Sequence, residues 1–379
     1  MKKLLNLLFV LISTFTIANA QEVNKEYEPK DTLQTKKAVA YYQGGEYPEY
    51  VQVFKAAIKT LSNYGWVEPI DLKRFKTSKE LWTHLSTNIK SDYLEFRKDL
   101  FYSSDWDSEK RNVNIKKIQK RIKIKNDIDL VLAFGTWAGQ DLSHNNIDKN
   151  TFVLSSNNPV GAKIIKSYKH SGYDYLHTNV DEKKFIKQIS LFHKIFNFKK
   201  MGVVYHNSDA GKSYAALDDA KKMAKKHNFE LLLCAVTPNQ DKSKEKKDLI
   251  KCYKKLATLS DAIYLTLNPM YNEEDLKYFM TNINNKKIPT FYQGGSLAIE
   301  NGALMGISND DFKYIGEFHA KAIIKTLNGA LIKDQSMFFE DPNILALNLK
   351  TAQTIEWDPS IDIIGITKEL YHSDIVQKY

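Results

Sequence analysis

The stretch DLVLAFGT, residues 129–136, decides the fold class of this chain. Its five consecutive apolar residues, Leu130–Phe134, are typical of a strand that is buried on both faces. A glycine and a threonine follow directly and mark the end of the run. Strands of this kind occur in parallel sheets covered by helices on both sides. The stretch therefore indicates an α/β protein.

Similar runs recur on both sides of this stretch and alternate with helical patterns. The predicted strands are 38–43, 93–97, 129–134, 151–155, 201–206, 230–236, 262–267, 288–292 and 303–307. The predicted helices are 48–63, 78–88, 113–125, 182–196, 213–226, 248–258, 273–283 and 311–327. A break near 157–161 separates two series. The pattern predicts two doubly wound parallel-sheet lobes.

Length and charge agree with a globular protein of two domains. The chain has 379 residues, with 55 Lys and Arg against 45 Asp and Glu, a formal charge of +10. The lysines are scattered, and the densest basic stretch, 116–125, has no aromatic residue on which bases could stack. We interpret this stretch as a solvated helix face and expect no nucleic-acid partner.

The first twenty residues indicate export. Lys2 and Lys3 precede an apolar run, Leu4–Ile17, and the small-residue pattern Ala18-Asn19-Ala20 follows it. This order is typical of a cleaved signal peptide. We expect cleavage after Ala20 and a periplasmic location.

Export would permit a disulfide between the two cysteines, Cys234 and Cys252. Two buried, unlinked small apolar residues are the alternative. The sequence leaves this choice open, because pairing depends on geometry.

Motifs for catalysis are missing from the sequence. It contains neither G-x-S-x-G nor H-E-x-x-H. Gly211-Lys212-Ser213 does not complete a phosphate-binding loop, because His206 stands where that loop needs glycine. We therefore expect a binding protein rather than an enzyme, with no cofactor and no metal. A secreted enzyme is the disfavoured alternative.

One short pattern occurs twice. Residues 41–45 read YYQGG and residues 291–295 read FYQGG, each at the end of a predicted strand. Ligands of open parallel sheets bind beyond the carboxyl ends of the strands, so both loops could line a ligand site. Chance and the turn preference of Gly-Gly explain the repeat equally well.

Three further strand-end loops carry groups suited to ligand binding. Free N–H groups at a helix start and the hydroxyl of Thr136 suit a carboxylate, and Asp209 or Glu46 suits an amine. The aromatic residues offer flat apolar faces, although the same residues could simply fill the core. Simple helix N-caps are the alternative for the polar groups. The predicted ligand-binding residues are Tyr42, Gln43, Glu46, Tyr47, Gly135, Thr136, Trp137, Asn207, Ser208, Asp209, Asn268, Gln293 and Gly294.

These loops also carry a family resemblance. The chain resembles substrate-binding proteins of ABC transporters with the type I periplasmic-binding-protein fold, in the branch that includes proposed tryptophan- and tyrosine-binding components. The departures are an extra helical segment, 69–88, and Asn158, where the branch has an aspartate. The matching segments are 129–136 (DLVLAFGT), 158–162 (NPVGA), 202–208 (GVVYHNS), 302–306 (GALMG), 326–329 (TLNG) and 348–352 (NLKTA).

The resemblance implies a periplasmic solute-binding component of an ABC importer. It would bind a small organic ligand, an amino acid or a flat amino-acid-like compound, in a cleft between two hinged lobes. Its partners would be an inner-membrane ABC permease and its ATPase, and we expect a monomer. A periplasmic sensory module that presents its ligand state to a membrane receptor kinase is the alternative.

The resemblance also implies that the chain crosses between the lobes at least three times. We expect lobe 1 to comprise 37–157 and 308–331, and lobe 2 to comprise 158–307. The segment 332–379 is not placed.

Overall fold

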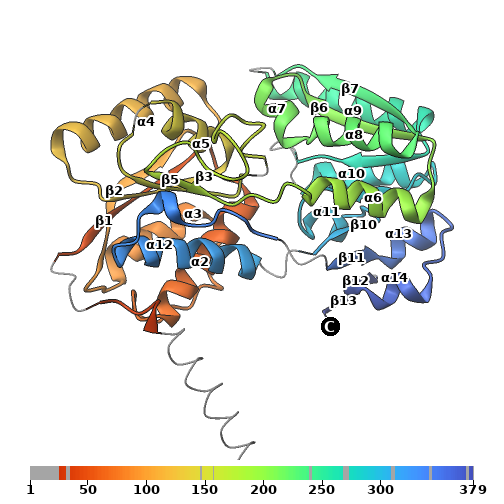
Figure 1. The fold of residues 1–379 in the computed structure, drawn as a ribbon. Coiled ribbons are helices and arrows are strands. Elements are labelled where there is room, and N and C mark those ends of the chain that lie inside the picture. Colours follow the sequence, from red (N-terminus) through yellow and green to blue (C-terminus); the bar gives the residue numbers. More distant parts are fainter. Residues whose placement is uncertain are drawn as a thin grey trace, which may run out of the picture. The chain divides into compact units, whose positions relative to one another are not determined.

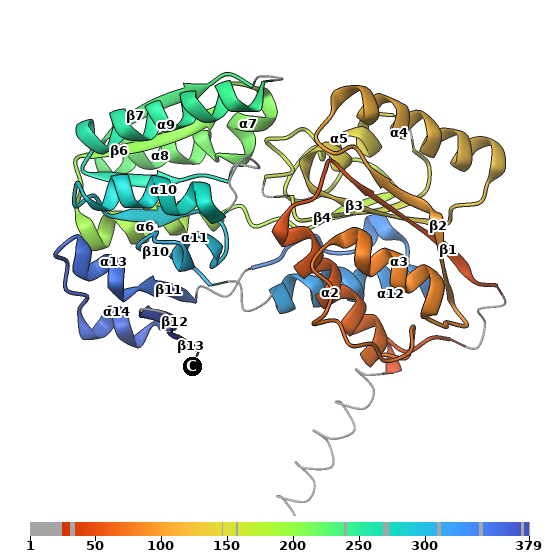
Figure 2. The same ribbon diagram turned by 180° about the vertical axis from the view of Figure 1, so that it is seen from behind.

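The computed structural model describes residues 25–30, 35–145, 147–156, 158–238, 241–267, 273–308, 312–340, 344–372 and 375–378. The expected signal peptide and Asn268 lie outside the described residues. The chain forms two compact units (Figure 1, Figure 2). Unit 1 comprises Met1–Ser155, His170–Asn179 and Phe312–Met337, and unit 2 comprises Ser156–Lys169, Val180–Asp311 and Phe338–Tyr379.

Unit 1 is built on a five-stranded sheet with the order β2-β1-β3-β4-β5. All neighbouring strands are parallel. The stretch 129–136 forms the central strand and the start of the helix Gly135–His144 after it, and all five residues of that strand are buried. The strands are β1 (Lys37–Gln43), β2 (Leu94–Ser103), β3 (Leu130–Phe134), β4 (Asn150–Leu154) and β5 (Leu176–Thr178).

Helices cover both faces of this sheet. Figure 1 shows α4 and α5 on one face and α2, α3 and α12 on the other. Helices α2 and α12 pack closely, because Gly316 leaves room for the backbone at Ala56. The helical elements of unit 1 are α2 (Pro48–Asn63), α3 (Ser78–Asn88), α4 (Ser108–Lys120), the π-helix η1 (Arg121–Lys125), α5 (Gly135–His144), α12 (Lys313–Leu327) and the 3₁₀ helix η3 (Ile332–Asp334).

The extra helical segment of unit 1 is packed on the sheet. Helix α3 begins with a capping box, in which the Thr77 hydroxyl accepts a hydrogen bond from the Glu80 N–H and the Glu80 carboxylate accepts one from the Thr77 N–H. The indole of Trp82, fully buried on this helix, donates to the Arg97 carbonyl on β2 at 3.0 Å. The segment thus covers the β2 edge of the sheet.

Unit 2 contains an eight-stranded sheet with the order β13-β12-β11-β10-β9-β8-β6-β7. The part from β7 to β10 is parallel, and β11 joins it antiparallel to β10. The strands are β6 (Lys200–His206), β7 (Glu230–Val236), β8 (Ala262–Leu265), β9 (Thr290–Tyr292), β10 (Met305–Ile307), β11 (Leu345–Asn348), β12 (Thr367–His372) and β13 (Ile375–Lys378).

The core of unit 2 lies between this sheet and its helices. Phe192, Met201 and Phe291 are fully buried in it. A disulfide joins Cys234 on β7 to Cys252 on α9, with the two Cα atoms 5.6 Å apart, so the pairing left open above is present. The helices of unit 2 are α6 (Lys184–Phe196), α7 (Asp209–Tyr214), α8 (Leu217–His227), α9 (Lys242–Leu259), α10 (Glu273–Asn284), α11 (Leu297–Glu300), α13 (Leu349–Thr354) and α14 (Ile361–Gly365).

Three local differences from the sequence expectation have physical reasons. Helix α4 starts at Ser108 rather than near 113, because the Asp107 carboxylate caps it by accepting from the Lys110 N–H at 2.8 Å. The helix expected over 213–226 is two helices, separated at Ala216, which has a φ of 50°. Strand β2 continues six residues past the predicted end at 97.

The chain also divides between the units differently from the expected lobes. Residues 170–179 belong to unit 1, where β5 pairs with β4. The segment that the sequence left unplaced is split, with 332–337 in unit 1 and 338–379 in unit 2. Among the described residues, no helix is both long enough and apolar enough to cross a membrane.

Candidate functional site

The loops after β1, β2 and β3 lie at the carboxyl edge of the unit 1 sheet, because these strands are parallel. They comprise residues 44–47, 104–107 and the start of α5. This is the edge at which open α/β sheets bind their ligands.

Two tryptophans meet at this edge. The rings of Trp106 and Trp137 pack edge to face with their centroids 5.6 Å apart, and both residues are half-buried. The Trp106 indole donates to the Glu46 carbonyl at 3.2 Å. A Cβ on Gly45 would lie 2.5 Å from this indole, so the second glycine of YYQGG makes room for the ring.

Trp106 was missed by the sequence reasoning. The predicted strand ended at 97, which left Trp106 outside the strand-end loops. The observed end of β2 at Ser103 places it directly in one. A tryptophan within the polar stretch SSDWD was the available signal.

Trp137 is held in place by a buried polar cluster. The Arg111 guanidinium lies 4.6 Å from the Trp137 ring centroid and forms an ion pair with Asp141 at 2.8 Å. The phenol of Tyr42 donates to the same carboxylate at 2.5 Å. Burial and the Asp141 charge raise the pKa of Tyr42. Tyr42, one of the predicted ligand-binding residues, is fully buried and bonds to the carboxylate that pairs with Arg111.

The polar groups of two other predicted residues bond to the protein itself. The Gln43 amide accepts from the Tyr41 hydroxyl at 2.8 Å and donates to the Ser103 hydroxyl at 3.3 Å. The Glu46 carboxylate accepts from the backbone N–H groups of Ser78 and Lys79, each at 3.2 Å, and so caps α3. These hydrogen bonds give the side chains of Gln43 and Glu46 a structural role within unit 1.

The start of α5 has unpaired groups. Phe134 is its N-cap residue and offers no side-chain hydrogen bond. The half-buried Thr136 hydroxyl has no hydrogen-bond partner among the described residues. Gly135 has a φ of +83°, and its Cα faces the Tyr50 hydroxyl. Tyr47 is half-buried, with its ring centroid 5.3 Å from that of Tyr50. Backbone N–H groups at such a helix start suit a carboxylate.

The predicted residues of unit 2 follow β6 and β9. The Ser208 hydroxyl accepts from the Gly211 N–H at 3.0 Å and caps α7, whereas Asn207 and Asp209 are exposed. The buried Gln293 amide accepts from the Leu267 N–H at 3.2 Å and donates to the Tyr214 carbonyl at 2.8 Å. Gly294 is buried and lies against the side chains of Leu267 and Tyr292.

A buried ionisable cluster lies beside these loops in unit 2. His206 Nε2 is 2.8 Å from the Glu245 carboxylate, and Lys242 pairs with the same carboxylate at 3.2 Å. Burial lowers the pKa of His206, and the Glu245 charge opposes this shift. Burial raises the pKa of Tyr214, whose hydroxyl is 3.3 Å from His206 Nδ1. In the described ranges, no group of three or more His, Cys, Asp or Glu side chains could hold a metal ion.

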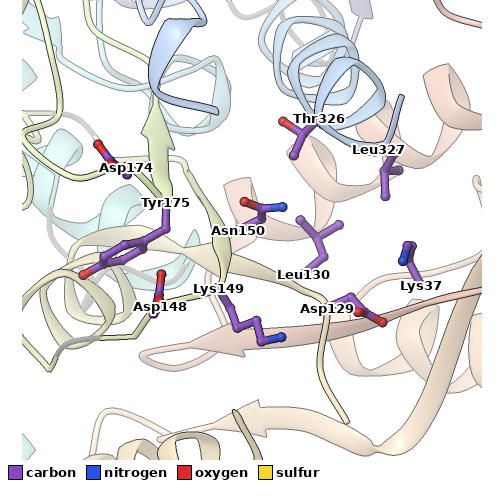
Figure 3. A pocket seen from close by; sticks show the side chains of 10 residues that line it. All are labelled: Lys37, Asp129, Leu130, Asp148, Lys149, Asn150, Asp174, Tyr175, Thr326 and Leu327. Carbon is purple, nitrogen blue, oxygen red and sulfur yellow. The ribbon is translucent and has the colours of Figure 1, made fainter. Parts of the chain in front are cut away.

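A separate pocket lies at the amino edge of the unit 1 sheet (Figure 3). It has a volume of about 320 Å³. Several of its polar groups are already paired: Asp129 with the Ala38 N–H, and Lys149 with Asn126. This edge is opposite to the tryptophan pair. Its lining residues are Lys37, Asp129, Leu130, Asp148, Lys149, Asn150, Asp174, Tyr175, Thr326 and Leu327.

Comparison with known proteins identifies the family. The sequence profile of ABC transporter substrate binding proteins matches residues 91–359, which is well over half of the chain. The chain belongs to this family. It is thus a substrate-binding component of an ABC transporter, a binding protein and not an enzyme. No curated protein matches the chain.

Solved structures show the same fold as this substrate-binding protein. An ABC domain from Streptococcus pneumonia, in complex with L-Trp, superposes with a TM-score of 0.69 and 19% identity, covering 89% of this chain and 100% of the other. A conserved domain protein from Vibrio cholerae gives 0.66 and 17%, with the same coverage. The ligand-free, open structure of the substrate binding protein CD0873 from Clostridium difficile gives 0.59 and 19%, covering 86% and 97%.

Proposed function

We propose that this substrate-binding protein binds an amino acid or a flat amino-acid-like compound in the periplasm and delivers it to an ABC permease and its ATPase. The observation that carries the proposal is the Trp106–Trp137 pair at the carboxyl edge of the unit 1 sheet. Two half-buried indoles offer large apolar faces for a flat ligand at little conformational cost. The L-Trp complex of the Streptococcus pneumonia protein is consistent with such a ligand.

The ligand carboxylate is assigned to the start of α5. The backbone N–H groups there have no capping side chain at Phe134, and the Thr136 hydroxyl is unpaired among the described residues. A helix N-terminus favours an anion through its free donors and its dipole. Tyr47, in the loop after β1, and Gly135, at the start of α5, belong to the same edge of the unit 1 sheet.

For the ligand amine, Asp209 remains a prediction from the sequence, and Glu46 is the weaker candidate. The Glu46 carboxylate already accepts two backbone hydrogen bonds at the start of α3, whereas Asp209 is exposed on unit 2. Asn207 is likewise exposed and remains a prediction from the sequence. Asn268 remains a prediction from the sequence.

The first experiment is a thermal-shift screen of amino acids and small heterocycles, since a ligand that binds the native state stabilises it by mass action. Calorimetry with the best compound then compares Trp137→Ala, Trp106→Ala and Thr136→Ala with the parent. We expect several-fold weaker binding for each tryptophan variant, because aromatic stacking contributes about 1 kcal/mol beyond area burial.

Two control variants separate ligand contacts from stability. Tyr278→Ala removes an aromatic side chain that is 46% exposed in unit 2 and should leave the affinity unchanged. Glu46→Gln should lower the melting temperature and change the affinity little. Asp209→Asn should lower the affinity and change the melting temperature little. If the Trp106 and Trp137 variants bind the compound as tightly as the parent, the tryptophan pair is not the site.

The periplasmic location is a part of the proposal that can be tested alone. Residues 1–20 have the pattern of a signal peptide with cleavage after Ala20. The intact mass of protein isolated from the periplasm of a Gram-negative host should correspond to a chain that starts at Gln21. A mass that retains Met1–Ala20 would contradict the assignment.

A further inference from the structure

Helix α4 and the π-helix η1 carry five exposed lysines without a counter-charge. We call Lys116, Lys117, Lys120, Lys123 and Lys125 the lysine strip. From Asn112 to Asn126 the sequence has no acidic residue. No lysine of the strip has an ion pair or a side-chain hydrogen bond within the described part of the chain. The strip is therefore a concentration of positive charge that unit 1 does not neutralise.

The nearby carboxylates are already bound by arginines. Arg121 pairs with Asp99 at 2.5 Å and with Asp127 at 2.6 Å, and Arg97 pairs with Asp127 at 3.0 Å. These ion pairs fasten η1 to the chain around β2. They also occupy the carboxylates of Asp99 and Asp127.

The same surface carries two exposed apolar side chains. Val113 is 49% exposed and Ile124 is 73% exposed, near the two ends of the strip. Val113, Lys116, Lys117 and Lys120 follow a spacing of three and four residues, which places them on one helix face. The opposite face is buried through Ile115, Ile118 and Ile122.

Figure 2 shows α4 on the same face of the unit 1 sheet as α5. The π-helix η1 follows α4 directly in the chain. Exposed lysines beside aliphatic side chains offer the two kinds of group with which a helix binds a membrane surface. Lysine ammonium groups supply the attraction to anionic headgroups, and the aliphatic side chains enter the boundary with the acyl chains.

We propose that the lysine strip, with Val113 and Ile124, binds the surface of membranes that contain anionic phospholipids. Nucleic acid fits this surface less well, because no aromatic residue lies between Asp107 and Ala133 to stack on bases. The proposal goes beyond the binding of a solute. Surface attachment would hold the protein near membrane-embedded partners.

The test is co-sedimentation of the full chain without its first twenty residues with vesicles of phosphatidylcholine alone or mixed with phosphatidylglycerol. We expect binding only when phosphatidylglycerol is present, weakening as salt is added. Each lysine near an anionic surface contributes roughly a fivefold factor, so replacing three of them should weaken partitioning about 100-fold. The triple variant is Lys116→Gln, Lys117→Gln and Lys120→Gln.

A matched control removes the same charge elsewhere. Helix α9 in unit 2 carries exposed lysines at a spacing of four residues, and the same helix also carries the acidic residues Glu245 and Asp248. The control variant is Lys247→Gln, Lys251→Gln and Lys255→Gln, and it should retain nearly all vesicle binding. Ile124→Ser should weaken the binding that persists at higher salt, because that part depends on apolar insertion.

Three outcomes would overturn the proposal. The first is an equal loss in both triple variants, which would show that net charge and not the strip is responsible. The second is the absence of binding to vesicles with phosphatidylglycerol. The third is binding to RNA or to an acidic protein that exceeds vesicle binding. Circular dichroism and thermal melting check that each variant is folded. Solute affinity is measured separately, so a failure here leaves the proposed solute site standing.

Discussion

The hydroxyl of Tyr50 occupies the space beside Gly135 so closely that a Cβ on Gly135 would lie 1.8 Å from its oxygen. Gly135 also has a φ of +83°, which L side chains rarely adopt. Gly135→Ala should therefore destabilise the protein by about 3 kcal/mol, from steric overpacking and backbone strain together. Urea unfolding followed by circular dichroism measures the loss.

Gly65 is the matched control for this prediction. It has a similar φ of +80°, but nothing lies within 4 Å of its Cβ position. Gly65→Ala should cost only about 1 kcal/mol, which is the backbone term alone. Equal losses in the two variants would show that the contact with Tyr50 is unimportant.

Asp219 on α8 is expected to reduce stability near neutral pH. Burial raises its pKa from the ordinary 3.8 to about 6, with Lys222 opposing the shift. A carboxyl whose folded pKa is raised contributes stability below its unfolded pKa, and this is lost as the pH rises through about 6. Asp219→Asn should stabilise the protein by about 1 kcal/mol near pH 7, a figure reduced for the part of the side chain that water reaches.

The neighbouring Asp218 is the control for Asp219. Its side chain is 97% exposed, and it lies in the same first turn of α8, so the helix dipole acts on both carboxylates. Asp218→Asn should not stabilise the protein. Denaturant unfolding near pH 4 and near pH 7 should show that the gain from Asp219→Asn is confined to the higher pH.

The buried His177 makes unit 1 sensitive to acid. Burial lowers its pKa to about 4, and its Nε2 is 3.0 Å from the Ser336 carbonyl. The unfolded chain binds a proton near pH 6.5, and the native state does so only near 4, so stability falls as the pH decreases through this window. We expect a loss of about 2 kcal/mol between about pH 7 and pH 5.

His177→Asn should flatten this pH dependence, whatever its effect on stability near pH 7. His144 is exposed on α5, and His144→Asn should leave the dependence as it is in the parent. Burial also lowers the pKa of the neighbouring His319. Replacing both His177 and His319 by asparagine should therefore flatten the pH dependence of stability further. An unchanged slope in His177→Asn would contradict the assignment.

The Cys234–Cys252 disulfide is expected to stabilise unit 2. It closes a loop with a sequence separation of 18 residues, for which loss of the crosslink should cost about 3 kcal/mol. Thermal melting with and without a reducing agent should show a lower transition temperature after reduction. The variant with serine at both positions should melt low in either condition, and any remaining effect of the reductant on it would point to another cause.

The fold could be predicted where the signals are local. Helix α2 starts at the expected residue because Pro48 occupies its first turn, and it also ends at the expected residue, Asn63. Strand β3 was found because it is buried on both faces. The strand predicted over 93–97 ends too early because β2 lies at the sheet edge, where Glu95, Lys98 and Asp99 break the apolar run. The three residues of β5 are too few to form a pattern.

The candidate site was less predictable, because its polar groups bond to residues far away in the sequence. Sequence reasoning could place Glu46 in a strand-end loop, but its task depends on the start of α3, 32 residues later. Gln293 depends likewise on Leu267 and Tyr214. Long-range pairing of this kind leaves no periodic signal in one sequence. Placing Trp106 required only the correct end of β2.

The repeated YYQGG and FYQGG segments end in loops whose shape is fixed within each unit. In both, the glutamine is buried and uses its amide on neighbouring groups of its own unit: Gln43 on Tyr41 and Ser103, and Gln293 on Leu267 and Tyr214. A small solute that meets loops already in their final conformation loses little of its binding free energy to ordering the protein. Removing either amide should therefore appear in calorimetry as a larger unfavourable entropy of association.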